Sequence, residues 1–388
     1  MKTKLSLLSL FVVLVSFTSA QSTFDVTFYD APTELETAMD YATDIWSGYL
    51  NSEVPIKVNL YYMNLTSFGP LGQCIPNGAI NFLSAEVSDV WYATSLANSI
   101  EGSELNPDEA DMNIFMNSSV NFYFGTDGNL GTGQMDFVSV VLHEIVHGLG
   151  GVSLAKYSSG SGSLGEITAS DFAPISTSFP FPDLDGYPSI WDSFIANGNG
   201  ESIIDTDIFT NPSTELGSAF VSGDLHFIGA GATSGNNNLS PKIFAPGSFQ
   251  FGSSIHHFDE ATFPNSTGNG LFTPSIANGQ VVHEPGLALL GALADIGWSV
   301  NQPVAINEEQ LGPISVYPNP VQDQLIVQLA GHQTSGILTV FSAEGQLIEK
   351  HLLNSPSLLI DCSHWAQGMY VLQLESAECN EQVRIVRM

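Results

Sequence analysis

The stretch VVLHEIVHGLGGVS, residues 140 to 153, places the tightest constraint on how this chain can fold. It continues an apolar run that predicts a helix, and on a helix His143 and His147 lie one turn apart on the same side. Gly148 and Gly150 then break the helix and turn the chain. Two imidazoles and a carboxylate are costly to bury in so apolar a segment unless they serve a function. The stretch therefore predicts a buried helix whose histidines and glutamate form a functional site.

The spacing H-E-x-x-H is typical of a zinc site in which both histidines bind one ion. Glu144 projects about 100° round the helix from His143, so it can take a proton from water without binding the metal. Zinc lowers the pKa of bound water to about 7. The pattern predicts hydrolysis of peptide bonds by water, with Glu144 as general base and no acyl-enzyme intermediate. A chance match of five letters is the alternative, and the apolar helical context favours the metal site.

A catalytic zinc site of this kind needs a third protein ligand. The pattern H-E-x-x-H-x-x-G-x-x-H would place a histidine at position 153, where this chain has Ser153, a poor zinc ligand. The alternative is a gluzincin site, in which a glutamate on a following helix is the third ligand. Glu166 lies at a suitable distance along the chain, but its surroundings, SSGSGSLGEITAS, are poor helix formers. The remaining candidates before the C-terminal part of the chain are His226, His256, His257 and His283.

The segment GSSIHHFDEATFPNSTGNGLFTPS resembles the corresponding part of leishmanolysin-type metzincins. In that family a long insertion precedes the third ligand, an aromatic and an acidic residue follow it, and a methionine-bearing turn comes soon after. His257-Phe258-Asp259 fits the ligand segment and Leu271 to Pro274 fits the turn, with Phe272 at the methionine position. The resemblance favours His257 as third ligand, with His256 as its neighbour or substitute, and it leaves His226 and His283 as loop or outer residues.

The resemblance is closer still to a group of secreted bacterial H-E-x-x-H proteins, because FGTDGN, GSSIHHFDE and ADIGW occur here in the same order. It covers residues 23 to 298. It implies an α+β, metzincin-like zinc peptidase domain over residues 21–300, with a mixed twisted sheet and a zinc helix. It implies one catalytic Zn²⁺ and protein or peptide substrates. The rival interpretation is a secreted adhesin on the same scaffold, and the intact Glu144 argues against it.

Within this domain the sequence predicts strands over residues 24–30, 55–65, 111–118 and 120–126, and helices over 32–50, 89–100, 135–149 and 287–298. Residues 151–250 are rich in Gly, Ser, Asn and Pro and show few periodic stretches. Asp259 or Glu260 either orients a ligand imidazole or is a solvated loop acid. The acids of PDLDGYP, Asp183 and Asp185, suggest Ca²⁺, but a plain turn ending at Gly186 explains them better.

The first twenty residues predict a signal peptide. Lys2 and Lys4 precede the apolar run LSLLSLFVVLVSF, and small residues Thr18 and Ala20 precede a cut before Gln21. The rest of the chain has six Lys and Arg against 40 Asp and Glu. So acidic a surface repels phosphate backbones and anionic lipid, which excludes nucleic acid and membrane surfaces as partners. We therefore expect an exported, soluble protein with no stable membrane span.

From residue 301 the composition changes. Residues 301–312 predict a linker, and residues 313–388 predict short strands divided by turns, as in a small all-β sandwich. The segments ISVYPNPVQDQLIV, VFSAEGQLIEK and GMYVLQL resemble the type A sorting domain of the type IX secretion system of Bacteroidetes. That resemblance implies contact with the secretion machinery and removal after export. The alternative is a carbohydrate- or protein-binding sandwich that stays attached.

Three cysteines are too few for a disulfide scaffold. Cys362 and Cys379 lie close enough in sequence to pair, which would leave Cys74 single. A cysteine that blocks the zinc site before activation is one interpretation of Cys74. Such residues usually lie in a propeptide, and almost nothing separates Gln21 from the first predicted strand.

Overall fold

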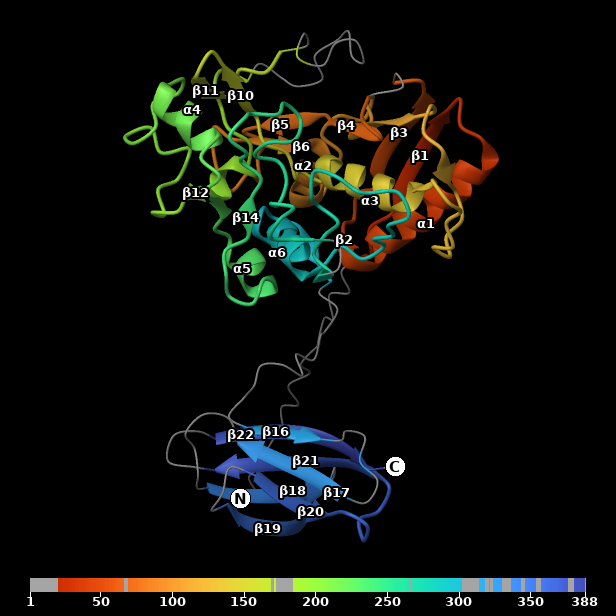
Figure 1. Cartoon of the computed structure of the whole chain (residues 1–388), viewed down its shortest axis with the longest axis vertical. Helices are drawn as coiled ribbons and strands as arrows, with labels where there is room; N and C mark the ends of the chain where they lie inside the picture. The colour runs from red at the N-terminus through yellow and green to blue at the C-terminus, as the bar shows by residue number, and fades with distance from the viewer. Residues whose placement is uncertain are drawn as a thin grey trace, which may run out of the picture. The chain divides into compact units, whose positions relative to one another are not determined.

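The computed structural model describes residues 20–65, 69–168, 171, 184–264 and 267–301, and in the C-terminal part 314–317, 321, 324–329, 336–342, 346–353, 357–375 and 380–387. The chain divides into two compact units between Pro303 and Val304, inside the predicted linker. Figure 1 shows the helices and strands of both units. Each unit has its own hydrophobic core. The predicted signal peptide lies outside the described residues except for Ala20.

A four-stranded sheet forms the centre of the first unit, in the order β1-β3-β7-β4. Strands β1 (Phe24–Tyr29), β3 (Ile56–Met63) and β7 (Met112–Asn117) are parallel. Strand β4 (Gly72–Pro76) is antiparallel to β7 and forms one edge. Buried residues alternate with partly exposed ones along most of β3, as expected for a strand with one face against the core.

Two helices, α1 (Thr33–Tyr49) and α3 (Phe137–Gly148), pack beside each other against this sheet (Figure 1). Helix α1 is the predicted helix over 32–50, which begins after Pro32 and has acidic residues in its first turn. The indole of Trp46 donates a hydrogen bond to the carbonyl oxygen of Leu142 at 3.3 Å. This contact ties α1 to the middle of α3, so the histidine-bearing helix is held from two sides.

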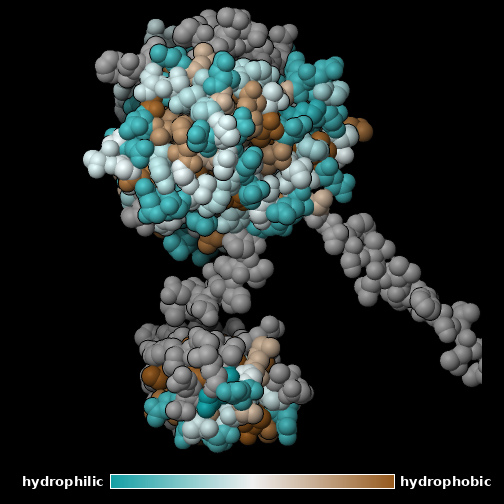
Figure 2. Space-filling model, turned by 90° about the vertical axis from the view of Figure 1, so that its right-hand side faces the viewer, coloured by the Kyte–Doolittle hydropathy of each residue, from teal (hydrophilic) through white to brown (hydrophobic). Residues whose placement is uncertain are grey.

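In the described residues, the region after α3 consists of short elements. They are β10 (Ala155–Ser158), β11 (Ser161–Leu164), the 3-10 helix η2 (Asp192–Phe194), β12 (Ile195–Asn197), α4 (Thr214–Phe220), β13 (Leu225–Phe227), α5 (Ala230–Gly235) and β14 (Lys242–Ile243). Helix α6 (Leu287–Asp295), which the sequence predicts, packs against α5. Strand β15 (Ser299–Val300) then pairs with β2 (Leu50–Asn51) and closes the unit. Hydrophilic residues are spread among smaller apolar patches on the face shown in Figure 2.

Two predicted elements differ in the structure. The helix predicted over 89–100 begins with a strand, β6 (Trp91–Ala93), because this bulky segment pairs with β5 (Gly78–Ile80), and only α2 (Thr94–Glu101) is helical. The strand predicted over 120–126 is limited to β8 (Phe122–Tyr123), which pairs with β9 (Met135–Asp136). Strands β4 and β5 were not predicted, because GQCIPNGAI lacks an alternating pattern.

In its described residues the second unit contains β-strands and no helix. Its strands are β16 (Ile314–Tyr317), β17 (Gln324–Leu329), β18 (Gly336–Ser342), β19 (Leu347–Leu353), β20 (Ser357–Asp361), β21 (Gly368–Glu375) and β22 (Asn380–Arg387). They form the sheets β16-β17-β20 and β19-β18-β21-β22. Leu325 from the first sheet and Leu338 and Leu372 from the second belong to one core. Cys362 is a buried free thiol. Cys379, which lies close enough in sequence to pair with it, is outside the described residues.

Candidate metal centre

Helix α3 carries His143 and His147 and has a defined start and end. At its N-terminus the carboxylate of Asp136 accepts the backbone N–H of Ser139 at 2.8 Å, as an N-cap residue does. At its C-terminus a side chain on Gly148 would meet Met112, since an added Cβ would lie 2.1 Å from the sulfur. Gly150 then adopts a φ of 106°, a conformation that favours glycine, and the chain turns away from the helix.

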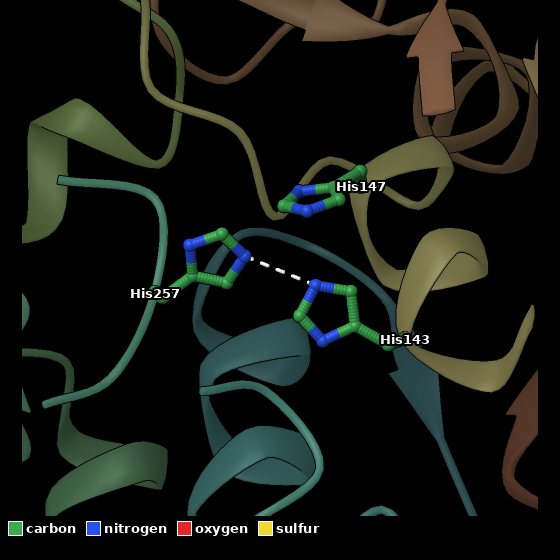
Figure 3. A group of neighbouring side chains, drawn as sticks. All are labelled: His143, His147 and His257. Carbon is green, nitrogen blue, oxygen red and sulfur yellow. Dashed lines mark hydrogen bonds between the residues drawn. The ribbon is translucent and has the colours of Figure 1, made fainter. Parts of the chain in front are cut away.

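The structure brings His257 to the two helical histidines, although more than a hundred residues separate them (Figure 3). One nitrogen from each of the three rings lies within 4.8 Å of the other two. The Nε2 atoms of His143 and His257 are 3.0 Å apart. Of the two adjacent histidines it is therefore His257 that joins the cluster.

Backbone carbonyl oxygens hold the other nitrogen of every ring. The Nδ1 of His143 lies 2.9 Å from the oxygen of Leu271, that of His147 lies 2.8 Å from Gly151, and that of His257 lies 2.8 Å from Ser253. A carbonyl oxygen only accepts, so each Nδ1 carries the proton and each Nε2 presents a lone pair. Lone pairs that converge in this way repel one another, and a cation among them removes the repulsion. The donor set therefore fits a metal ion.

The protonation of these rings agrees with that arrangement. Burial lowers the pKa of His143 to about 4. Burial first, and then the neighbouring histidines, hold the pKa values of His147 and His257 well below their usual range. All three imidazoles are therefore neutral at pH 7, which is the form that binds a metal.

Phe272 lies against all three rings. Its ring centroid is 5.3 Å from that of His143 and 5.0 Å from those of His147 and His257. The backbone of the same segment is tied to the ligand loop, because the N–H of Phe258 donates to the oxygen of Phe272 at 2.9 Å. A phenyl ring thus occupies the place beneath the histidines at which the resemblance implied a methionine.

Glu144 faces strand β4 and lines the same cavity as the histidines. Burial raises the pKa of Glu144 to about 8, and a hydrogen bond from the backbone of Cys74 partly opposes this shift. Gly72 leaves room for the carboxylate, because an added Cβ there would lie 2.9 Å from both Cγ and Oε1 of Glu144. The cavity, of about 680 Å³, is bordered by β4, α3, the turn after α3, and loop residues around positions 251–257 and 270–276.

A second network fixes the loop that carries the third histidine. The carboxylate of Asp192 accepts the N–H groups of Leu154 and Ser189 at 3.0 and 2.9 Å. The indole N–H of Trp191 donates to the oxygen of Ile255 at 3.1 Å. Ile255 has a φ of 72°, which is rare for a β-branched residue and marks a strained turn directly before the paired histidines. Sequence reasoning did not find this network, since no local pattern links residues so far apart.

The other candidates are not part of the three-histidine cluster. His226 contacts Asp224 at 3.2 Å, and His283 contacts the helix cap Asp136 at 2.7 Å. Ser153 is fully buried, and its hydroxyl oxygen accepts the N–H of Ala155. Glu166 is exposed on its loop.

The acids that follow His257 form no hydrogen bond to its ring, whose Nδ1 donates to the carbonyl oxygen of Ser253 and whose Nε2 faces that of His143. Asp259 accepts the N–H and the hydroxyl of Thr262, and Glu260 accepts the hydroxyl of Ser275. Both are therefore loop acids. Asp185 and Gly186 have positive φ values in a turn, while Asp183 lies outside the described residues.

Comparisons with known proteins describe the two ends of the chain. Residues 315–387 match the family model of a secretion system C-terminal sorting domain. Residues 16–158, which include α3, match a family described as SPBPB7E8-like. The comparison with curated proteins gives no match. Within the described residues, no helix has the length and apolar character needed to cross a bilayer.

Two solved structures show limited similarity. PorZ, a bacterial surface component of the type IX secretion system of Porphyromonas gingivalis, is 17% identical, with a TM-score of 0.18 over 19% of this chain and 11% of that chain. A DUF3244 family protein from Bacteroides vulgatus, described as an immunoglobulin-like β-sandwich, is 14% identical, with a TM-score of 0.17 over 19% of this chain and 81% of that chain. TM-scores this low carry no argument about the fold.

The sorting domain defines the class of this protein. It is an exported protein of the Bacteroidetes type, which the type IX system carries to the cell surface or the medium. The C-terminal unit is the part that contacts the secretion machinery.

Proposed function

We propose that residues 21–300 form a secreted zinc-dependent endopeptidase of metzincin-like architecture. In this proposal His143, His147 and His257 hold one Zn²⁺, and Glu144 is the general base. The observation that carries the proposal is the convergence of three Nε2 lone pairs in one cavity that Glu144 also lines. A structural zinc site has four protein ligands as a rule, whereas three histidines leave a position for water or substrate.

The donor set supports zinc in particular. Imidazole nitrogens are among the preferred ligands of Zn²⁺, and the three rings are neutral and held by backbone hydrogen bonds before any ion arrives. When bound, Zn²⁺ supplies Lewis-acid polarisation of the carbonyl and lowers the pKa of water to about 7.

Glu144 moves the proton. Its carboxylate takes a proton from the attacking water and delivers it to the amine that leaves. Burial raises the pKa of Glu144 to about 8 in the metal-free protein, and a cation beside it would lower that pKa towards neutrality. Glu144 can then both accept and release a proton near pH 7, which is what a group that acts as base and then as acid requires.

The shape of the cavity supports a peptide as substrate. The antiparallel edge strand β4 borders the cavity over its whole length, from Gly72 to Pro76. The exposed backbone of an edge strand pairs readily with an extended peptide. A peptide bound in this way would lie along β4 beside Glu144. The substrate class is therefore protein or peptide in extended conformation.

The test uses the secreted protein with casein or gelatin as substrate. The proposal expects cleavage that stops with a metal chelator, returns when Zn²⁺ is added, and is lost in the Glu144→Ala variant although zinc remains bound. If the parent protein shows no chelator-sensitive cleavage, and Glu144→Ala binds the same partners as the parent, the protein is an adhesin on this scaffold and the peptidase proposal is wrong.

A further inference from the structure

A fourth histidine belongs to the same cavity and is not part of the ligand cluster. His256 is 7% exposed and lines the cavity next to His257. Its ring centroid is 5.9 Å from that of His147 and 6.1 Å from that of His257. It is therefore the nearest imidazole to the cluster in the described cavity wall without being one of the three that converge.

The hydrogen bonding of His256 is the reverse of that of the three ligand rings. The backbone N–H of Ser153 donates to the Nδ1 of His256 at 3.2 Å. An N–H group only donates, so the Nδ1 of His256 carries a lone pair and its proton is on Nε2. The three cluster rings each present a lone pair at Nε2, whereas His256 presents a donor.

That donor is free to act on a ligand. Within the described residues, the Nε2 of His256 has no hydrogen-bond partner, although the side chain is more than nine-tenths buried. This nitrogen is not itself fully buried, so it is open to the cavity that the ring lines, where a bound ligand can accept a hydrogen bond from it. The hydrogen bond from Ser153 fixes the orientation of the ring.

We propose that His256 is a further catalytic residue, which donates its Nε2–H to the carbonyl oxygen of the scissile peptide bond as negative charge develops there. This inference rests on the proposed peptidase function. It adds to the zinc ion a second group that stabilises the negative charge on the carbonyl oxygen. A donor that is already oriented stabilises a developing oxyanion without having to reorganise.

Two substitutions at His256 test the proposal. His256→Phe keeps the ring and removes the donor, while His256→Gln keeps an N–H donor and an acceptor for Ser153. We expect kcat to fall about 100- to 1000-fold in His256→Phe, as when one oxyanion donor is removed, with a much smaller change in KM. His256→Gln should recover at least part of that loss, and both variants should keep their zinc. His226→Phe, an equivalent change outside the cavity, should match the parent protein.

Two measurements do not depend on turnover. The affinity for a phosphinic peptide, a tetrahedral mimic of the transition state, should fall in His256→Phe in parallel with kcat/KM when measured by calorimetry. Nitrogen-15 NMR of the metal-free parent protein should show a proton on Nε2 of His256 and on Nδ1 of the three cluster histidines. If His256→Phe does not fold, His256→Gln and the NMR assignment decide the question.

The results separate the two proposals. Chelator-sensitive cleavage by the parent protein together with unchanged kcat in a folded His256 variant overturns the role of His256 and leaves the peptidase proposal standing. Equal losses in the Phe and Gln variants, accompanied by loss of zinc or of thermal stability, also overturn it, because His256 is then only a positioning residue. No cleavage by the zinc-loaded parent protein overturns both.

Discussion

At the scale of single residues, backbone carbonyl groups set the chemistry of the three-histidine cluster. Each ring of the cluster donates its Nδ1–H to a carbonyl oxygen, from Leu271, Gly151 or Ser253. From the sequence, Asp259 or Glu260 was either a partner for a ligand ring or a loop acid, and both form hydrogen bonds within their loops. A neutral carbonyl fixes the tautomer as a carboxylate does, but it adds no negative charge beside the ligand.

The buried titratable groups predict how the stability of the metal-free protein depends on pH. Burial lowers the pKa of His143 and His256 from 6.5 to about 4, and those of His147 and His257 move in the same direction. The unfolded chain therefore binds more protons below about pH 6.5, and stability falls as the pH falls towards 4. Glu144 acts in the opposite sense, because its pKa rises from 4.5 to about 8. Its contribution is present below pH 4.5 and is lost as the pH rises towards 8.

Thermal melting of the chelated protein between pH 4 and pH 8 tests the direction in which each group changes the stability. From these groups we expect the highest melting temperature near pH 6.5. Between pH 6.5 and 8 the Glu144→Gln variant should lose less stability than the parent protein, because the group responsible is absent. Equal losses in the two proteins would contradict the raised pKa of Glu144.

Phe272 predicts a graded response to substitution. Phe272→Ala would leave a void against all three histidine rings, at a cost of about 3–5 kcal/mol, and should weaken zinc binding. Phe272→Met keeps an apolar side chain of similar reach and should cost far less. Zinc content and chemical denaturation of both variants check this. Equal zinc loss in the two variants would show that ring stacking, and not filled volume, supports the site.

The identity of the clustered histidines was within reach of the sequence, and their partners were not. The helical spacing pairs His143 with His147, and the resemblance of His257-Phe258-Asp259 to the leishmanolysin-type ligand segment favoured His257 over His256. The carbonyl oxygens that orient the rings leave no trace in residue identity, because every residue has one. The same holds for Trp191, whose bond to Ile255 spans 64 residues.

At the scale of elements, the distance between β4 and α3 determines where Glu144 lies. Gly72→Ala would place a Cβ 2.9 Å from Cγ and Oε1 of Glu144, and the carboxylate would have to move. We expect a loss of kcat of at least tenfold with zinc retained. Gly48→Ala is the matched control, because nothing lies within 4 Å of its added Cβ. In helix α1 this control should stabilise the protein by about 0.5–1 kcal/mol and leave kcat unchanged.

Steady-state kinetics and metal analysis of these two glycine variants measure whether kcat falls while zinc remains bound. Full activity in Gly72→Ala would show that β4 does not constrain Glu144.

Elements with a regular pattern were predictable, and those defined by pairing were not. Helix α1 follows from Pro32 and its acidic first turn, and β3 from its alternation of buried residues. Strand β4, which borders the cavity, contains Gly72 and Pro76 and has no alternation to reveal it. Trp91 to Ala93 looked like the start of a helix, and only pairing with β5 shows that it is a strand.

At the scale of the whole molecule, the division into two units separates the candidate site from the export signal. Each unit has its own core, and all residues of the candidate site lie before Pro303. A chain without residues 304–388 should therefore fold and keep its activity, but remain inside the cell envelope. Cell fractionation with an antibody to the first unit measures this.

Full-length Glu144→Ala is the control for that experiment, since it should still reach the surface or the medium. Appearance of the truncated chain at the surface would show that the C-terminal unit is dispensable for export. The composition change at residue 301 was enough to predict this division from the sequence. The arrangement of short elements between α3 and α6 was not, because long-range contacts, and no local pattern, hold the described residues of the 151–250 region in place.

The most direct test of the account is the metal content and coordination of the purified protein, by mass spectrometry and X-ray absorption. We predict one zinc ion per chain, with three imidazole nitrogens at about 2.0–2.1 Å, and loss of that zinc in His257→Ala but not in His256→Ala. Zinc that remains in His257→Ala, or a parent protein that binds none, would contradict the three-histidine site.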